Sequence, residues 1–450
     1  MPHQDRFLEW ANPRSTPAGF LQMRLGKSLC ATRWAIARAP RRERCLIVSP
    51  LSVLPSWRRE LSLEGEPAPV ELTGSSQERE RAMLRAGSDH RWYLINREGL
   101  LTREDGRTIP SAYARLPWDR VILDESTTIR NPKAKVTRAV LDHLADAPEK
   151  IILSGLPNPE GPEDYVTQML FLRGEFMGCR NFWDWRAEHM NPGRFGWTLK
   201  NKSVGLIHAE VGRWSYFLTR KQAGLKDEKL RQTRWVRPPA KVMRAIREAR
   251  RNFQVGERLT SNALTALAWA CQLAGGRYPG DPALQHDAKL DELSDLCAGE
   301  FRDGRVVVWA RHTAEIEAAA ERLCQDGRLV RVVTGEVPSQ ERERAIATFN
   351  ERSRAVLVAQ PQCLKMGVDL SAARVAIVMS NYFDYEVRAQ MEDRLVHPKL
   401  DEPALIIDVV CEGTEDEDVL EALTEKEATA KGFNARLAAL VRKRKERDRA

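Results

Sequence analysis

The chain has 450 residues, enough for about two or three domains that each bury a core, and its composition excludes a disordered protein. Its formal net charge is +8 and its pI is near 9.1, but 30% of the residues are charged, so nucleic acid is only weakly implied as a partner. Eight cysteines are scattered without a Cys-x-x-Cys or a paired Cys/His spacing, which argues against a structural zinc site and favours reduced thiols. The first residues lack an apolar signal segment, and no apolar run approaches about 18 residues. We therefore expect a soluble cytoplasmic protein that is not exported.

The first part of the chain alternates short apolar runs, rich in β-branched residues, with helical patterns. This alternation is typical of βαβ units around a buried parallel sheet. It predicts one doubly wound lobe over residues 1–173. The expected strands are Cys45 to Val48, Tyr93 to Ile95, Val121 to Leu123 and Ile151 to Leu153.

From about Gly174 the sequence becomes tryptophan-rich and basic, which predicts a helical insertion and linker over residues 174–288. We expect most of its tryptophans to be structural core residues. Strand patterns then resume and predict a second α/β lobe over residues 289–426, followed by a basic helix or tail over 427–450. The fold class expected is thus α/β, with two doubly wound parallel-sheet lobes in tandem. The strands of the second lobe are expected at Val306 to Trp309, Val330 to Val333, Val356 to Val358, Val375 to Val378 and Leu405 to Val410.

A phosphate-binding loop is predicted at Leu25-Gly26-Lys27-Ser28. A Gly-Lys-Ser turn that opens a helix offers backbone N–H groups to phosphate oxygens, a lysine to the β- and γ-phosphates, and a hydroxyl to Mg²⁺. Arg24 precedes this loop and either contacts phosphate or points to solvent.

The apolar segment Val121-Ile122-Leu123 ends in Asp124-Glu125. A carboxylate at the end of a strand can hold the Mg²⁺ shell, and the next one can orient the attacking water. Ser28 and Asp124 are therefore the predicted Mg²⁺ ligands, and hydrolysis of a nucleoside triphosphate is the predicted chemistry.

Other segments extend this pattern along nearly the whole chain. Ser49 to Glu60 carries a Pro-x-Ser-hydrophobic-x-x-x-Trp-x-x-Glu pattern that includes Trp57, and Ile152 to Asn158 carries Ser-Gly-Leu-Pro. Together with the phosphate loop and the Asp-Glu pair, they resemble the motifs of SWI/SNF-type ATPases in helicase superfamily 2. The second lobe continues the resemblance with Gly335, Arg342, Ile346, Phe349, Asn350, Gly367-Val368-Asp369-Leu370, Gln390-Met391-Glu392-Asp393-Arg394, Glu412-Gly413-Thr414-Glu415 and Lys426.

The resemblance implies a RecA-like fold for both lobes and roles for further residues. Gln4 is expected to read the adenine edge, because a carboxamide supplies both a donor and an acceptor. Arg394 is expected to act as an arginine finger, or else to form a structural salt bridge with Asp393 or Glu392. The remaining implied site residues are Gln390, toward the γ-phosphate or the attacking water, and Gly367 and Asp369, on the nucleotide or the coupling network.

Departures from the family pattern put efficient turnover in doubt. Arg24 stands where the family usually has glycine. Within Ile152 to Asn158, Leu156 replaces the threonine of the family's Ser/Thr-Gly-Thr-Pro motif, which couples hydrolysis to motion and is called the coupling motif below. Gln390 to Arg394 corresponds to the family's motif VI, and His397 stands in place of the second arginine of that motif. A histidine is a cation only when protonated, so either turnover is slower or another arginine, such as Arg388, serves instead. Arg220-Lys221 resembles a basic motif near the DNA, with a solvated basic face as the equal alternative. With the compact length, these features resemble family members encoded by phages and prophages.

The function implied is an ATP-dependent motor that moves on duplex or branched DNA through sequence-independent backbone contacts, in phage or bacterial replication, recombination or repair. Two alternatives stay open. One is a weakly active or inactive ATPase that acts as a DNA-binding structural or regulatory factor. The other is a strand-separating or RNA-directed helicase of superfamily 2.

Overall fold

The computed structural model describes residues 1–38, 43–86, 90–193, 196–225, 229–364, 368–396 and 403–430. Gly367, His397 and the tail residues 431–450 lie outside the described residues. The chain divides into two compact units: the described residues of 1–225 and 428–430 form the first, and those of 229–427 form the second. We describe each unit by itself.

The first unit is built on a seven-stranded sheet in which every pairing is parallel. Along each strand, alternate side chains enter different cores, because successive residues of a strand point to opposite faces. Val121 and Leu123 belong to one core, for example, and Ile122 to the other. The strand order is β11 (Ser215–Leu218), β1 (Ala18–Leu21), β8 (Glu149–Ser154), β7 (Arg120–Leu123), β2 (Cys45–Val48), β4 (Trp92–Ile95) and β3 (Val70–Leu72).

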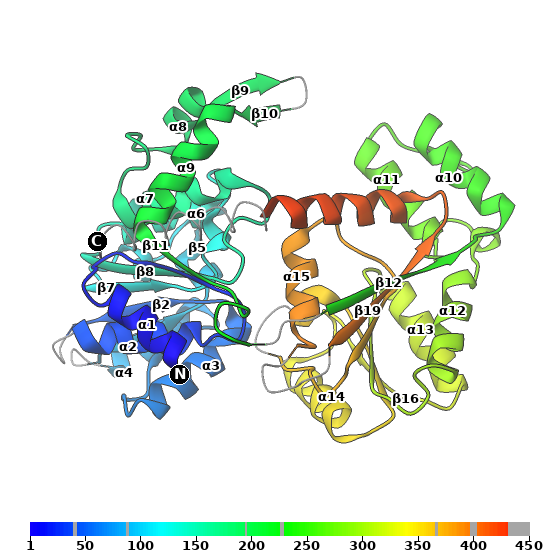
Figure 1. Cartoon of the computed structure of the whole chain (residues 1–450), viewed down its shortest axis with the longest axis horizontal. Coiled ribbons are helices and arrows are strands. Elements are labelled where there is room, and N and C mark those ends of the chain that lie inside the picture. The colour runs from blue at the N-terminus through cyan, green and yellow to red at the C-terminus, as the bar shows by residue number, and fades with distance from the viewer. Residues whose placement is uncertain are drawn as a thin grey trace. The chain divides into compact units, whose positions relative to one another are not determined.

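Helices cover both faces of this sheet (Figure 1), as the two cores require. One face packs against α1 (Pro2–Ala11), α2 (Lys27–Arg38) and α3 (Leu54–Leu63). Two hairpins, β5 (Leu101–Glu104) with β6 (Arg107–Pro110) and β9 (Met190–Gly193) with β10 (Gly196–Leu199), extend the unit. The other face packs against α4 (Ser76–Ala86), α5 (Ala112–Arg115), the end of α6 (Lys135–Ala139) with residues 140–144, α7 (Tyr165–Arg173), α8 (Phe182–His189) and α9 (Asn201–Trp214).

The second unit repeats this plan with six parallel strands. Their order is β12 (Lys229–Val236), β19 (Ala404–Cys411), β18 (Val375–Val378), β15 (Val306–Trp309), β17 (Ala355–Ala359) and β16 (Leu329–Val333). A small hairpin joins β13 (Gln254–Val255) to β14 (Arg258–Leu259), and residues 415–427 of this unit are helical. The other helices are α10 (Ala240–Asn252), α11 (Ala263–Ala274), α12 (Ala288–Ala298) and α13 (Thr313–Gln325) on one core, and α14 (Ser339–Glu351) and α15 (Tyr385–Asp393) on the other.

The α/β class and all nine expected strands are confirmed, but four sheet strands were missed: β1, β3, β11 and β12. β1 reads Ala-Gly-Phe-Leu and has no β-branched residue. Its Gly19 is required by close packing, since a Cβ there would lie 3.0 Å from Leu153 Cδ2 and 3.1 Å from the Phe7 ring. β12 is a largely polar edge strand, which sequence patterns do not separate from a basic linker.

The segment expected as insertion and linker supplies β11 to the first sheet and β12 to the second. The boundaries proposed from sequence, at 173, 288 and 426, remain predictions. Trp185 is buried as expected, but the expectation is wrong for three other tryptophans. Trp183, Trp197 and Trp235 are 40%, 42% and 52% exposed.

Candidate nucleotide site

The predicted phosphate loop joins the carboxyl end of β1 to the first residue of α2. Lys27 and Ser28 are half-buried at the helix N-terminus, where unpaired N–H groups favour anions. Two loop residues adopt left-handed backbone conformations, Arg24 at φ 66° and Gly26 at φ 81°. The loop is therefore a tight turn, in which the Leu25 N–H donates to the Gln22 carbonyl at 3.3 Å, and it leads directly into the N-terminus of α2.

Helix α1 closes one side of this loop. His3 and Gln4 are buried, and the Gln4 Nε2 donates to the carbonyl of Leu25 at 3.3 Å. The Gln4 amide lies so close that a Cβ at position 26 would be 2.2 Å from Nε2. The structure thus brings Gln4 to Leu25 and Gly26, and its role toward adenine stays a prediction.

Lys27 lies beside the segment that follows β8. A Cβ built on Gly155 would be 3.3 Å from the Lys27 Nζ, so a side chain there would crowd the ammonium group. Next in this segment, the N–H of Leu156 donates to the Ser154 Oγ at 3.1 Å. The predicted phosphate and coupling motifs therefore adjoin because β1 and β8 are paired neighbours.

The Asp124 carboxylate is fixed by two donors from the neighbouring β2–α3 segment. Its Oδ2 accepts from the Ser49 Oγ at 3.0 Å and from the Trp57 indole N–H at 2.9 Å. Trp57 is fully buried, as a packing role predicts, but its hydrogen bond to Asp124 was missed. The available signal is general: a buried indole N–H almost always finds an acceptor.

Glu125 follows in a left-handed conformation, with φ 47° and ψ 61°. Its N–H donates to the Asp124 Oδ1 at 3.0 Å. A non-glycine residue in this region is strained, and such strain is concentrated at functional sites. The chain therefore makes a strained, left-handed turn directly after Asp124.

A buried glutamine connects the Asp-Glu segment to the coupling segment. The Gln168 Oε1 accepts from the Ser126 Oγ at 2.6 Å, and its Nε2 donates to the carbonyls of Pro157 and Asp164 at 2.7 Å each. Sequence analysis missed this residue. The sequence feature that could have identified Gln168 is a glutamine within α7, a helix that is otherwise mostly apolar, and its amide is fully buried in the structure.

Asp164 itself is buried next to this bridge. Its Oδ2 accepts from the N–H of Glu160 at 2.8 Å and of Gly161 at 3.4 Å. Burial raises the pKa of Asp164 to about 7, although these donors and Arg130 oppose the shift.

The second unit brings together two predicted motifs, Val368-Asp369-Leu370 and Gln390 to Arg394. The Arg394 guanidinium donates to the carbonyl of Val368 at 3.2 Å, and the N–H of Leu370 donates to the carbonyl of Arg394 at 3.2 Å. Asp369 holds its own turn by accepting from the N–H of Ser371 at 3.0 Å. Gln390 lies on α15, one helical turn before Arg394, and its buried Oε1 has no hydrogen-bond partner among the described residues.

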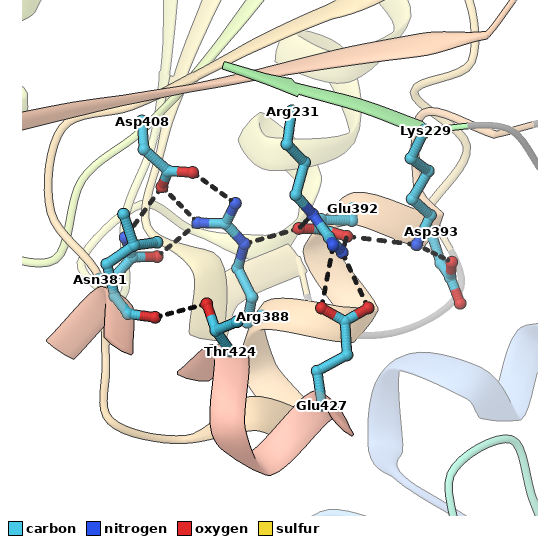
Figure 2. Close-up of polar contacts among 10 residues, drawn as sticks. Lys229, Arg231, Asn381, Arg388, Glu392, Asp393, Asp408, Thr424 and Glu427 are labelled. Carbon is cyan, nitrogen blue, oxygen red and sulfur yellow. Dashed lines mark hydrogen bonds and ion pairs between the residues drawn. The ribbon is translucent and has the colours of Figure 1, made fainter. Parts of the chain in front are cut away.

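A buried ion network holds α15 (Figure 2). Arg388 donates to both oxygens of Asp408, at 2.5 and 2.8 Å, and to the Glu392 Oε1 at 2.7 Å. Lys229 and Arg231 of β12 reach Glu392 from the other side, at 3.3 and 2.7 Å. Burial alone would raise the pKa of Glu392, but Arg388, Lys229 and Arg231 hold it well below its usual value.

This network corrects the expectation that Arg388 could replace the missing arginine of motif VI. The Arg388 side chain is buried, and moving it toward a nucleotide would leave Asp408 and Glu392 as unpaired buried charges. His397, the other residue concerned, lies outside the described residues. Arg220 is also buried, so a solvated basic face is wrong for it, whereas Lys221 is exposed.

Comparison with known families agrees with these motifs. The SNF2-related domain matches residues 3–213, and the helicase conserved C-terminal domain matches residues 288–399. The chain therefore carries an SNF2-related domain followed by a helicase conserved C-terminal domain. Two RecA-like lobes account for its two parallel sheets.

Similar proteins include larger eukaryotic members. The chain is 23% identical over 322 residues to the SWI/SNF-related matrix-associated actin-dependent regulator of chromatin subfamily A-like protein 1 of Drosophila melanogaster, over 68% of this chain and 40% of the relative. It is 30% identical over 146 residues to DNA repair protein RAD5A of Arabidopsis thaliana, over 31% of this chain and 14% of the relative. The chain thus spans less than half the length of these relatives. A solved structure, the Sulfolobus solfataricus SWI2/SNF2 ATPase core in complex with dsDNA, is 17% identical with a TM-score of 0.45, over 96% of this chain and 93% of that one.

We predict that Trp57→Phe weakens Mg²⁺-dependent nucleotide binding by about 10-fold and lowers the free energy of unfolding by about 1–3 kcal/mol, because a buried donor to a carboxylate is lost. Trp34→Phe is the matched control, since its buried indole donates to the Arg14 carbonyl at 3.2 Å, away from Asp124. It should reduce stability by about 1 kcal/mol and leave nucleotide affinity unchanged. Denaturant unfolding and nucleotide titration measure both quantities, and equal nucleotide affinities in the two variants would contradict the role of Trp57.

We predict opposite effects at the two left-handed positions of the phosphate loop. Arg24→Gly should raise the free energy of unfolding by up to about 1 kcal/mol, because relief of left-handed strain outweighs the added unfolded-state entropy. Gly26→Ala should lower it by more than about 1 kcal/mol, since φ is 81° and the new Cβ meets the Gln4 amide. Urea unfolding checks both signs, and a destabilised Arg24→Gly would show that the Arg24 side chain contributes more than its backbone costs.

The raised pKa of Asp164 predicts a pH-dependent stability. The folded protein keeps this proton up to a pH of about 7, whereas the unfolded chain releases it near the usual aspartate pKa of 3.8. The contribution to stability is therefore complete below about pH 4 and lost as pH rises toward 7. Asp164→Asn keeps an acceptor for both N–H groups and should stabilise the protein by on the order of 3 kcal/mol above pH 7, and by progressively less toward pH 4. Asp142→Asn, at an exposed carboxylate, is the control. Unfolding free energies with the same pH slope in wild type and Asp164→Asn would refute the assignment.

Proposed function

We propose that the chain is a DNA-dependent ATPase that moves along duplex or branched DNA. The observation that carries the proposal is the grouping of Lys27, Asp124 and Glu125 in the first unit. Their segments follow β1 and β7, which both pair with β8, and the segment after β8 carries Gly155 beside Lys27. In doubly wound sheets, ligands bind at the carboxyl ends of the strands.

The residues at the carboxyl ends of β1 and β7 fit Mg²⁺-ATP. The N-terminus of α2, the Lys27 ammonium and the Ser28 hydroxyl would hold the phosphates and the metal, and Asp124 would hold the metal with a carboxylate that is already oriented. Bound Mg²⁺-ATP would supply the phosphoanhydride whose hydrolysis drives the motor. Glu125 orients the attacking water, and Gln4 contacts the adenine edge.

The second unit would complete the reaction with cationic and amide groups. Arg394 serves as the arginine finger, and Gln390 contacts the γ-phosphate or the attacking water. Its buried Oε1 without a hydrogen-bond partner among the described residues supports a ligand-facing role. Asp369 keeps its proposed contact with the nucleotide or the coupling network, and Gly367 belongs to the same motif.

DNA is the proposed track because the family includes a DNA repair protein and because the chain carries a net charge of +8. We propose backbone contacts that are independent of sequence and weaken with salt. Among the described residues, no helix is long and apolar enough to cross a membrane. We place the protein in the cytoplasm of a bacterial or phage-infected cell, in replication, recombination or repair.

The test is ATP hydrolysis by wild type, Lys27→Ala and Glu125→Gln, with single-stranded, duplex, forked and four-way DNA, and with RNA. We predict stimulation by duplex or branched DNA. Glu125→Gln should lower kcat by about 10²–10⁴-fold while nucleotide binding persists, because only water activation is lost. Lys27→Ala should lose nucleotide binding itself.

Three other outcomes would each overturn part of the proposal. Equal and negligible hydrolysis by wild type and Lys27→Ala would favour a DNA-binding structural or regulatory factor, which Leu156 in the coupling segment would suit. Stimulation by single-stranded RNA alone would make the substrate RNA. Separation of forked strands without displacement of a third strand from duplex DNA would favour an unwinding helicase.

A further inference from the structure

The first unit holds a group of metal-binding side chains outside the nucleotide site. Cys179, Glu188 and His189 each bring a ligand atom to within 4.8 Å of the other two. Within the part of the chain that the structure describes, no other group of three His, Cys, Asp or Glu residues meets this condition. The group lies in the segment between α7 and α9, which carries no nucleotide motif.

Two tight local structures present these residues. Cys179 ends a turn in which the N–H of Phe176 donates to the Cys179 carbonyl at 2.8 Å and the N–H of Cys179 donates back at 3.0 Å. Met177 and Gly178 provide the left-handed backbone for this turn, at φ 55° and 82°. Glu188 and His189 end α8, whose start is capped by the Asn181 side chain. The spacing is therefore fixed by a turn and a helix of eight residues.

The orientation of His189 supplies the second observation. Its Nδ1 is hydrogen-bonded to the Ser203 Oγ of α9 at 3.1 Å, which leaves the other ring nitrogen toward Glu188. That Nε2 is buried and has no hydrogen-bond partner among the described residues, although His189 is only 5% exposed. A metal-bound histidine is usually oriented in this way, through a hydrogen bond on its second nitrogen.

The distances suit a small tetrahedral cation. The Cys179 Sγ lies 3.6 Å from the Glu188 Oε2, and the His189 Nε2 lies 3.9 Å from the Glu188 Oε1. Ligand bonds of about 2.0–2.3 Å around zinc place neighbouring ligand atoms about 3.3–3.6 Å apart. The ligand atoms of Cys179 and His189 lie within 4.8 Å of each other, so a small shift of these two side chains is needed as well as a rotation of Glu188, which is 66% exposed.

We propose that Cys179, Glu188 and His189 bind one Zn²⁺ ion, with water in the fourth position. Thiolate, imidazole and carboxylate together select zinc over Mg²⁺, which prefers oxygen ligands. The bound ion joins the turn at Cys179 to the end of α8 and, through Ser203, to α9. This site goes beyond the proposed ATPase function and does not depend on it.

Protonation in the metal-free protein is consistent with the site. Burial lowers the pKa of His189, so that the imidazole is neutral and able to bind a metal. Burial and the Glu188 carboxylate raise the pKa of Cys179, so the thiol must lose its proton on binding.

The test uses the full chain, stripped of metal under reducing conditions and titrated with Co²⁺ and Zn²⁺. We expect one ion per chain and a thiolate-to-cobalt charge-transfer band. Cys179→Ser should abolish the band, and Cys324→Ser, at an exposed cysteine of the second unit, should leave it unchanged. Competition with a chromophoric chelator should show that Glu188→Gln loses more than about 100-fold in zinc affinity, and Ser203→Ala about 10–100-fold.

Because Glu188 is exposed, its variant should fold and keeps the test decisive even if Cys179→Ser does not. The proposal is wrong if wild type shows no thiolate band, if the band persists in Cys179→Ser, or if Glu188→Gln binds zinc as tightly as wild type. None of these readouts involves ATP hydrolysis, so failure here and failure of the proposed ATPase are distinguishable.

Discussion

The position of the Asp124 carboxylate is the constraint on which the proposed nucleotide site depends. An aspartate at the end of a strand could point in several directions, but here Ser49 and Trp57 both donate to Oδ2. Both donors belong to the segment that follows β2, the direct neighbour of β7. The parallel pairing of two strands therefore sets a carboxylate rotamer, and the Oδ1 is occupied by the N–H of Glu125. A catalytic group held by neighbours in this way needs little reorganisation when a metal arrives.

The second unit positions its groups by a different physical means. Arg388 and Glu392 are four residues apart on one face of α15, and Gln390 and Arg394 are four apart on a face about 200° away, from the 3.6-residue period of a helix. The ion network with Asp408, Lys229 and Arg231 fixes the first face. Because breaking a buried ion pair costs about 3–5 kcal/mol, the helix has one favoured rotation. The charged face thus determines where Gln390 and Arg394 point without taking part in the proposed chemistry.

The sequence was sufficient for the α/β class, for the central strands and for the turn that opens α2 at Lys27, because runs such as Val121-Ile122-Leu123 and the Gly-Lys-Ser turn are local patterns. It failed where tertiary contact decides: β1 depends on Gly19 fitting against Leu153, and β12 is polar because it lies at an edge. Gln168 and the indole donor of Trp57 were missed for the same reason, since their partners are 42 and 67 residues away. The Cys179, Glu188 and His189 group also escaped, because a search for paired Cys/His spacings does not detect a cysteine nine residues before a Glu-His pair.

The place of Leu156 bears on whether the coupling segment has degenerated. Its backbone N–H donates to the Ser154 Oγ, and threonine and leucine share this backbone group. The contact from the Asp-Glu segment runs instead from Ser126 through Gln168 to the carbonyl of Pro157, and it requires no side chain at position 156. A movement of Ser126 can therefore be transmitted to Pro157 through the Gln168 amide, which is fully buried and whose oxygen and nitrogen are both hydrogen-bonded. The leucine removes one hydroxyl from the motif but leaves this contact intact, so the substitution by itself is weak evidence for an inactive motor.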